Sequence, residues 1–267
     1  MSLFYLLLVA IIQGITEFLP ISSSGHLAIL PQMTGQDDQG LAIDIAVHVG
    51  SLFAVILYFW KEVKMAGAGC LRLMRGKVDT QSAFLALCLC IATVPVMVAG
   101  ALVKLTGLDE ALRSVAVIGW TMLGFGLVLY WADRTSTSER DFEGWTLRDA
   151  LAMGLVQMLA LIPGTSRAGI TITAARKLGY SRDGAARISM LMSIPAILAS
   201  GVVLSVDVVG KADWDMARNA AIASLFSFAA ARLALGFMMR MLRNVSFTPY
   251  VVYRVILGSI LLIYAYS

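Results

Sequence analysis

Long apolar runs separated by short polar segments dominate this chain. Six runs approach or exceed the length needed to cross a bilayer and are bounded by charged residues or by Pro and Gly, namely residues 41–60, 84–103, 113–131, 186–206, 217–238 and 248–266. A helix needs about 20 mostly apolar residues to span the hydrocarbon core. The pattern therefore predicts six transmembrane helices.

Two further apolar segments are too polar or too short to span. Residues 3–19 contain Gln13 and Glu17 and stop at Pro20, and residues 150–162 stop at Pro163. Each is followed by Ser or Thr residues and by a second short apolar stretch, at 27–30 and at 170–175. Irregular backbone at membrane depth is tolerated only where protein or a polar cavity surrounds it, so each segment is predicted to be a re-entrant helix–loop–helix hairpin.

The distribution of Lys and Arg tests this topology. With six spans and two hairpins, 14 of the 21 basic residues fall in loops on one face, and four fall on the other: Lys104, Arg113, Lys211 and Arg218. If both hairpin segments crossed the membrane, the same residues would divide as ten and eight. Because cytoplasmic loops carry the basic excess, the hairpin topology is favoured. It places both termini, Asp207, Asp213 and Asp215 outside the cytoplasm.

An internal repeat follows from this topology. We predict an all-α integral membrane protein with a single domain, residues 1–267, made of two inverted-topology repeats at about 1–131 and 147–267. Each repeat is one re-entrant hairpin plus three transmembrane helices, and Pro20-Ile-Ser-Ser23 matches Pro163-Gly-Thr-Ser166, with Gln13 and Gln157 preceding. An odd number of spans inverts the second repeat, so the hairpins enter from opposite faces and their tips can meet near the midplane.

Composition agrees with a membrane protein and excludes other classes. The chain is 59% hydrophobic and 14% charged, which excludes a soluble globular enzyme and a disordered chain. The net charge of +4 is explained by the basic loops, so no nucleic-acid partner is expected. Three cysteines imply neither a disulfide nor a metal knuckle. No Lys or Arg precedes Lys61, so the N-terminal apolar stretch is expected to stay in the mature protein.

The first hairpin tip, residues 13–26, gathers groups that an apolar segment should avoid. Gln13 and Glu17 are four residues apart and share a helix face, and an acid at that depth costs about 2.5–3.5 kcal/mol. In a functional interpretation Glu17 binds a cation or acts as a general base, and the hydroxyls face an anionic substrate. In a structural one, Gln13 and Glu17 bond to freed backbone groups and the serines cap the next helix. Three serines and His26 beside a buried acid favour function.

The second tip, residues 163–169, places Arg167 and two hydroxyls at a helix start. Unpaired N–H groups and the positive end of the helix dipole favour phosphate there, and a guanidinium binds phosphate oxygens in a bidentate manner. The alternative is that Arg167 reaches the cytoplasmic surface near Arg176 and Lys177. The two tips together contain what phosphoryl transfer needs, which is a nucleophile, a proton acceptor and a charge clamp.

Other intramembrane polar residues give weaker signals. His48 and Asp44 lie four apart on the first span and could line the cavity, although a histidine on an apolar helix is more often simply hydrogen-bonded. Arg232 and Arg254 are site candidates by default, and Arg254 could equally pair with backbone carbonyls.

The two tips resemble the bacterial undecaprenyl-diphosphatases of the bacitracin-resistance type. Residues 13–26 match that family's (Glu/Gln)-x-x-x-Glu motif followed by Phe-Leu-Pro-(Ile/Val)-Ser-Ser-(Ser/Thr)-Gly-His. Residues 163–169 match its Pro-Gly-x-Ser-Arg-Ser-Gly motif, with Ala168 in place of serine. Family-like stretches also occur at 44–55, 193–197 and 247–254. Two long motifs in the right order make the resemblance specific, and it covers essentially the whole chain.

The resemblance implies hydrolysis of undecaprenyl diphosphate to undecaprenyl phosphate and inorganic phosphate. This reaction recycles the lipid carrier of peptidoglycan synthesis and confers bacitracin resistance. The resemblance also implies a multi-pass protein of the bacterial cytoplasmic (inner) membrane, an active site that opens to the periplasmic face, and dependence on a divalent cation, Mg²⁺ or Ca²⁺. The sequence leaves open a homodimer.

Residue roles carry over from the same resemblance. The catalytic set is Glu17, Ser23, His26 and Arg167, and the expected substrate-binding residues are Gln13, Ser22, Ser24, Thr165 and Ser166. Glu17, with Gln13 beside it, would bind the metal or activate the nucleophile, which is expected to be Ser23. His26 would handle protons, with the division of labour between Ser23 and His26 left open, and Arg167 with Ser166 would hold the diphosphate.

Two departures from the family pattern matter. At Ala168 a hydroxyl is missing, so that hydroxyl is dispensable or its role passes to Thr165 or Ser24. The first position of the (Glu/Gln)-x-x-x-Glu motif is Gln13 here, so the motif has one carboxylate instead of two. Tight metal binding by Gln13 and Glu17 alone is therefore not expected.

The alternative function is an inverted-repeat secondary transporter or lipid-carrier flippase, because half-helix tips that meet near the midplane are typical of that class. A transporter has less use for a serine beside a histidine and a buried glutamate, so the enzyme is favoured.

Overall fold

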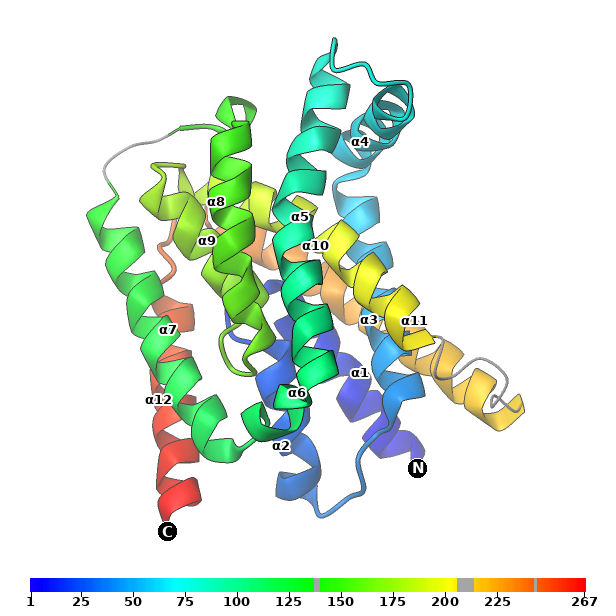
Figure 1. Cartoon of the computed structure of the whole chain (residues 1–267). Coiled ribbons are helices and arrows are strands. Elements are labelled where there is room, and N and C mark those ends of the chain that lie inside the picture. The colour runs from blue at the N-terminus through cyan, green and yellow to red at the C-terminus, as the bar shows by residue number, and fades with distance from the viewer. Residues whose placement is uncertain (137–139, 206–213, 243) are drawn as a thin grey trace.

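Six helices long and apolar enough to cross a membrane form the frame of the molecule. The computed structural model describes residues 1–136, 140–205, 214–242 and 244–267. Within these ranges every regular element is helical. The long helices are α3 (Leu41–Tyr58), α5 (Gln81–Thr106), α7 (Val115–Thr135), α10 (Arg182–Ser205), α11 (Trp214–Met241) and α12 (Thr248–Tyr266) (Figure 1). The six predicted spans are therefore confirmed, whereas Asp207, Lys211 and Asp213 lie outside the described residues.

The two defective segments form interrupted helix pairs, as predicted. The first pair is α1 (Leu3–Phe18) and α2 (Ser23–Thr34), separated by a break at Pro20. The second is α8 (Leu147–Gln157) and α9 (Arg167–Lys177), with a short 3₁₀ segment, η2 (Met158–Leu161), before the break. Side-chain caps start the first member of each pair, because Ser2 and Thr146 accept hydrogen bonds from N–H groups three residues on.

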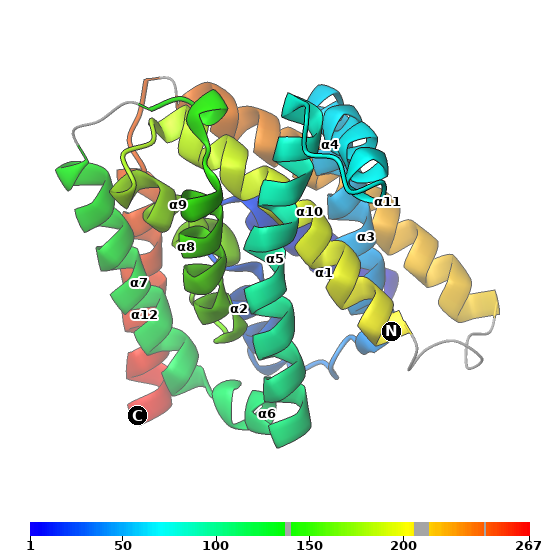
Figure 2. The same cartoon turned by 45° about the horizontal axis from the view of Figure 1, so that its top comes forward.

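The pairs enter the molecule from opposite ends. In Figure 1 the outer ends of α8 and α9 lie at the end occupied by α4 (Trp60–Leu73), whereas both chain termini and α6 (Leu108–Leu112) lie at the other. Each pair packs mainly on the opposite half of the chain, with α1 along α11 and α8 along α5 (Figure 2).

Glycine permits both of these close contacts. A Cβ added at Gly14 would lie 2.5 Å from the carbonyl oxygen of Ser227, and one added at Gly154 would lie 2.6 Å from that of Ala92. Both distances are far inside van der Waals contact. The two halves of the chain are interlocked rather than placed side by side.

Helix α4 corrects one prediction, since the pattern of apolar runs leaves residues 61–83, between the spans at 41–60 and 84–103, as a loop. The segment consists mostly of good helix formers and has an apolar side that packs against α5. Gly69 lets α4 approach α5 so closely that an added Cβ would overlap the carbonyl oxygen of Ser82. Its apolar stretch is too short and too charged to register as a span, which is why the pattern of long apolar runs missed it.

A buried ion-pair cluster fastens the basic end of the molecule. Asp133, at the end of α7, is 3% exposed, and its Oδ1 accepts hydrogen bonds from Arg176 Nε at 3.1 Å and Arg182 Nε at 2.8 Å. Its Oδ2 accepts one from the Phe247 N–H at 3.3 Å. The cluster therefore ties α7 to α9, to α10 and to the segment before α12.

We expect Asp133→Ala to lower the free energy of unfolding by about 3 kcal/mol, because removing one partner leaves a buried guanidinium without its counter-charge. Thermal unfolding of the purified protein in detergent measures this. Asp79→Ala is the matched control, since Asp79 pairs with Arg72 at the exposed surface and should leave the midpoint unchanged. Equal effects of the two substitutions would contradict the prediction.

Candidate active site where the two hairpin tips meet

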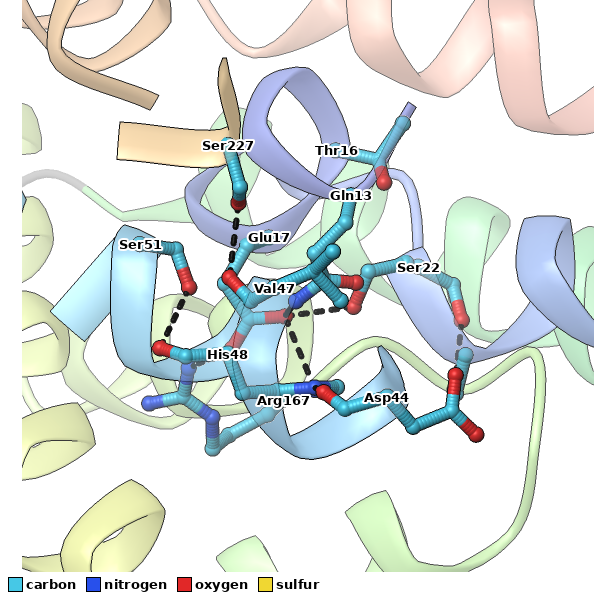
Figure 3. A network of polar contacts seen from close by, with 12 residues as sticks. Gln13, Thr16, Glu17, Ser22, Asp44, Val47, His48, Ser51, Arg167 and Ser227 are labelled. Carbon is cyan, nitrogen blue, oxygen red and sulfur yellow. Dashed lines mark hydrogen bonds and ion pairs between the residues drawn. The ribbon is translucent and has the colours of Figure 1, made fainter. Parts of the chain in front are cut away.

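A single carboxylate joins the two tips. Glu17, near the end of α1, is 7% exposed. Its Oε2 accepts hydrogen bonds from Gln13 Nε2 at 2.8 Å and Ser23 Oγ at 2.6 Å, and its Oε1 accepts one from Arg167 Nη2 at 2.6 Å (Figure 3). Ser23 and Arg167 are the first residues of α2 and α9. Three of the predicted site residues therefore gather within hydrogen-bonding distance of a fourth, Glu17.

The break before each second helix has the same local geometry. Ser22 and Ser166 are the N-caps of α2 and α9, with φ angles of 73° and 70°. Each Oγ accepts a hydrogen bond from the glycine N–H three residues on, at 3.3 Å from Gly25 and 3.0 Å from Gly169. A positive φ at a non-glycine residue costs about 1–3 kcal/mol. It persists only where the surrounding structure holds it in place, and such residues cluster at functional sites.

This geometry shifts the match between the tips by one residue. The sequence comparison paired Ser23 with Ser166, but conformation and capping pair Ser22 with Ser166. The reason is that the second tip has one more residue between its proline and its cap. The shift also places Gln13 and Gln157 at the same distance, nine residues, before the caps.

The tips also approach each other closely at Gly25 and Gly164, and Gly164 lets the second tip pack tightly against α7. Its φ is 87°, and an added Cβ would clash with Thr121 Oγ1 on α7. Thr121 Oγ1 donates a hydrogen bond to the Pro163 carbonyl at 2.6 Å. A Cβ on Gly25 would lie 3.4 Å from the Cα of Gly164. The two tips therefore come together in the structure.

His26 lies apart from the Glu17 network. Its Nδ1 donates to the Ser22 carbonyl at 2.6 Å, which leaves Nε2 to accept from the Tyr253 hydroxyl at 2.6 Å. The His26 and Tyr253 rings are stacked. Within the described part of the chain, His26 makes no hydrogen bond to Ser23 or Glu17. Its predicted role as proton handler stays a prediction.

The remaining predicted residues occupy different surroundings. Ser24 is exposed, and its Oγ lies 3.3 Å from that of Ser22. Thr165 is fully buried, and its Oγ1 has no hydrogen-bond partner among the residues the structure covers. Ala168, where the family pattern has serine, is 2% exposed in the apolar core. Of the two hydroxyls expected to replace that serine, only the one of Thr165 is buried at the tip with a free hydrogen-bonding capacity.

His48 is the site residue to which sequence reasoning gave too little weight. Its Nδ1 donates to the Asp44 carbonyl at 2.7 Å, as expected for a histidine on a helix, but its Nε2 lies 3.8 Å from Glu17 Oε2. The side chain is 38% exposed, so it connects the buried carboxylate with the exterior of the site. The available signal was its position four residues after Asp44 on a span.

Arg232 and Arg254, the two candidate arginines whose roles the sequence left undecided, have different surroundings. Arg254 is fully buried and donates to backbone carbonyls, including one from each tip. Arg232 is exposed on α11, and its guanidinium lies 5.0 Å from the centre of the Tyr58 ring. Only Arg254 belongs to the region of the tips.

Gln13 and Glu17 supply only one carboxylate for a divalent cation, and the predicted cation site stays a prediction. Both Glu17 oxygens accept hydrogen bonds, and the Arg167 guanidinium already gives this carboxylate a positively charged partner. Over the described ranges, no group of three or more His, Cys, Asp or Glu residues could hold a metal ion. Mg²⁺ is usually held by one or two carboxylates together with waters and substrate phosphates, so these two side chains alone do not complete its ligands.

The arrangement can support attack on an anionic substrate. A hydroxyl held 2.6 Å from a carboxylate is a nucleophile paired with its base. A guanidinium and two helix N-termini at the same point supply positive potential for an incoming phosphate. Substrate would compete with Glu17 for Arg167, because the Arg167 guanidinium donates a hydrogen bond to the Glu17 carboxylate.

Comparisons with known proteins give a consistent result. The model of a family described as bacitracin resistance protein BacA matches residues 6–260. The chain is 72% identical to an undecaprenyl-diphosphatase of Roseobacter denitrificans and 66% identical to one of Dinoroseobacter shibae, each over all of both chains. It is 45% identical to undecaprenyl-diphosphatase 1 of Rhodospirillum rubrum over all of this chain and 96% of that protein.

Proposed function

This chain belongs to the BacA family of bacitracin resistance proteins, and on that premise we propose that it is an undecaprenyl-diphosphatase. It is a multi-pass membrane hydrolase that converts undecaprenyl diphosphate to undecaprenyl phosphate and inorganic phosphate. The reaction recycles the lipid carrier for peptidoglycan synthesis, and bacitracin resistance is the trait linked to the family.

The observation that carries this proposal is the joint contact of Ser23 and Arg167 with Glu17. Ser23 Oγ attacks the terminal phosphorus of the diphosphate while Glu17 takes the hydroxyl proton. The bond between that phosphorus and the bridging oxygen breaks, and undecaprenyl phosphate leaves. Water then attacks the phosphoserine, which releases inorganic phosphate and restores the Ser23 hydroxyl. Arg167 and the α2 and α9 N-termini stabilise the charge of the transition state.

The finer architecture is part of the same proposal. The two halves are inverted-topology repeats, each with one re-entrant hairpin and three spans. Support comes from the matching caps at Ser22 and Ser166 and from the entry of the hairpins at opposite ends (Figure 1). The end that carries α4 holds the basic loops and is assigned to the cytoplasm. The site is open to the periplasmic face, which is the end of the molecule from which the first hairpin enters.

The direct test is phosphate release by the purified wild-type protein in detergent micelles. With undecaprenyl diphosphate we expect one inorganic phosphate and one undecaprenyl phosphate per substrate consumed. The same assay, run with Mg²⁺, with Ca²⁺ and with a chelator, tests whether activity depends on a divalent cation. Light scattering of the same sample tests whether the protein is a homodimer. Absence of phosphate release under all these conditions would remove the proposed function. Movement of intact lipid in proteoliposomes without hydrolysis would favour the transporter.

His48 gives a smaller, specific prediction. We expect His48→Gln to lower kcat by about 3- to 10-fold, because Glu17 loses a partly exposed imidazole through which its proton can reach water. KM should change by less, since His48 does not contact the tips' anion-binding groups. Steady-state phosphate release measures both constants. An unchanged kcat would show that His48 is only hydrogen-bonded to its own helix.

A further inference from the structure

Arg254 is a fully buried cation that bonds only to carbonyl groups. It lies on α12, and its Nε donates to the Met122 carbonyl at 3.0 Å. Its Nη2 donates to Thr121 at 3.2 Å and to Gly164 at 3.0 Å, and its Nη1 donates to Pro20 at 3.3 Å. No carboxylate pairs with it anywhere in the described ranges. A charge kept in the membrane interior without a counter-ion needs such a complete set of acceptors.

The two tip carbonyls that Arg254 binds are equivalent. Pro20 lies two residues before the cap Ser22, and Gly164 lies two residues before the cap Ser166. One guanidinium therefore bridges corresponding points of two loops that are 144 positions apart in the chain. The other two acceptors belong to α7, whose Thr121 also binds the neighbouring Pro163 carbonyl. The bridge is thus anchored to a helix that spans the membrane.

Glycine at two positions leaves room for this guanidinium. A Cβ added at Gly126 would lie 3.2 Å from Arg254 Cβ, and one added at Gly169 would lie 2.8 Å from its Nη1. Gly169 is also the residue whose N–H caps onto Ser166. The side chain therefore contacts the first turn of α9 as well as the loop before it.

We propose that Arg254 is a positioning residue that fixes the distance between the two tips, and hence the position of Ser23 relative to Arg167. Ser23 and Arg167 directly follow the two caps and meet at Glu17. A shift of either tip would move the nucleophile and the charge clamp independently of each other. Displacement of reacting groups by about 1 Å can cost 100-fold in rate. This inference rests on the proposed function for its kinetic effect but not for its structural one.

The kinetic test compares Arg254→Met with Arg176→Met. Arg176 is a second buried arginine, bonded to Asp133 at the basic end of the molecule and remote from the tips. Both substitutions should lower the thermal midpoint. Only Arg254→Met should also lower kcat per folded molecule, by about 100-fold, with KM changed by less than about fivefold, because much of the ground-state affinity comes from the lipid chain.

Arg254→Lys is a second variant that keeps the inference testable if Arg254→Met does not fold. Lysine keeps the charge but donates from one nitrogen to at most three acceptors, so it cannot reach four separated carbonyls. We expect a thermal midpoint close to that of the wild type and a kcat about tenfold lower. If folded samples of both Arg254 variants keep kcat within threefold of the wild type, the inference is overturned.

Hydrogen exchange followed by mass spectrometry gives a readout without activity. The N–H groups of His26 and Ile170 donate to the carbonyls of Ser22 and Ser166. In both Arg254 variants, amides of both tips should exchange at least about tenfold faster, whereas Arg176→Met should leave them protected. Unchanged protection at either tip would contradict the bridge. If the wild type released no phosphate, the proposed function would fail, while exchange would still decide this inference.

Discussion

Glu17→Gln is expected to lower kcat by at least about 1,000-fold. The amide is not a base at neutral pH, so Ser23 loses the group that takes its proton, and general-base catalysis alone accounts for about 100- to 10,000-fold. The amide also cannot balance the charge of Arg167, whose Nη2 lies 2.6 Å from the carboxylate. Phosphate release by protein that elutes as a single peak from size-exclusion chromatography measures the effect.

Gln13→Ala is the matched control for this experiment. It removes a different hydrogen bond to the same Glu17 oxygen but leaves the carboxylate and its charge in place. We expect a loss of about tenfold, which corresponds to a hydrogen bond of about 1.4 kcal/mol. If Glu17→Gln lost no more activity than Gln13→Ala, the carboxylate would not be the base.

Ser23→Ala is expected to be at least as damaging as Glu17→Gln, because it removes the nucleophile itself. What remains should be the slow attack of water within the charge clamp of Arg167 and the helix N-termini. In the wild type, an acid quench during turnover of a substrate labelled at the terminal phosphate should trap a phosphoserine. The label should be absent in Ser23→Ala.

The chemistry of the trapped label separates Ser23 from His26. Phosphoserine survives acid, whereas phosphohistidine does not, so a label that acid destroys and base preserves would assign the nucleophile to His26. Thr34→Ala, at the far end of the same helix, is the control and should keep both the label and turnover, because Thr34 Oγ1 donates to carbonyls of the last turn of α2, away from the tips.

Hydropathy predicted the fold well because each membrane span is specified locally. A run of about 20 apolar residues identifies a span wherever it occurs, and the two segments that failed this criterion proved to be the interrupted pairs. Helix α4 was missed because its stability depends on packing against α5, including the close approach at Gly69. A single sequence does not indicate which surface an amphipathic segment covers.

The sequence predicted which residues belong to the candidate site, but not which of them contact one another. Glu17 and Arg167 stood out because charge is costly at membrane depth. The pairing of Ser22 with Ser166 depends on backbone conformation, which the aligned letters concealed. The approach of His48 to Glu17 and the bonds from Arg254 to Pro20 and Gly164 join residues 31 to 234 positions apart. Such contacts are fixed by the packing of whole helices and leave no local pattern.

The interlocked packing of the two halves has a consequence for biogenesis. Helix α1 lies along α11, which the ribosome produces only after about four-fifths of the chain has been made. Until then the helix that carries Glu17 lacks the surface on which it rests, although Arg167 has already been made. The first hairpin must therefore wait at the translocon or at the bilayer surface while the four spans that precede α11 are inserted around it. Contacts of such long range slow folding, so a truncated chain that ends before α11 should expose its polar tip to lipid and become a substrate for membrane proteases.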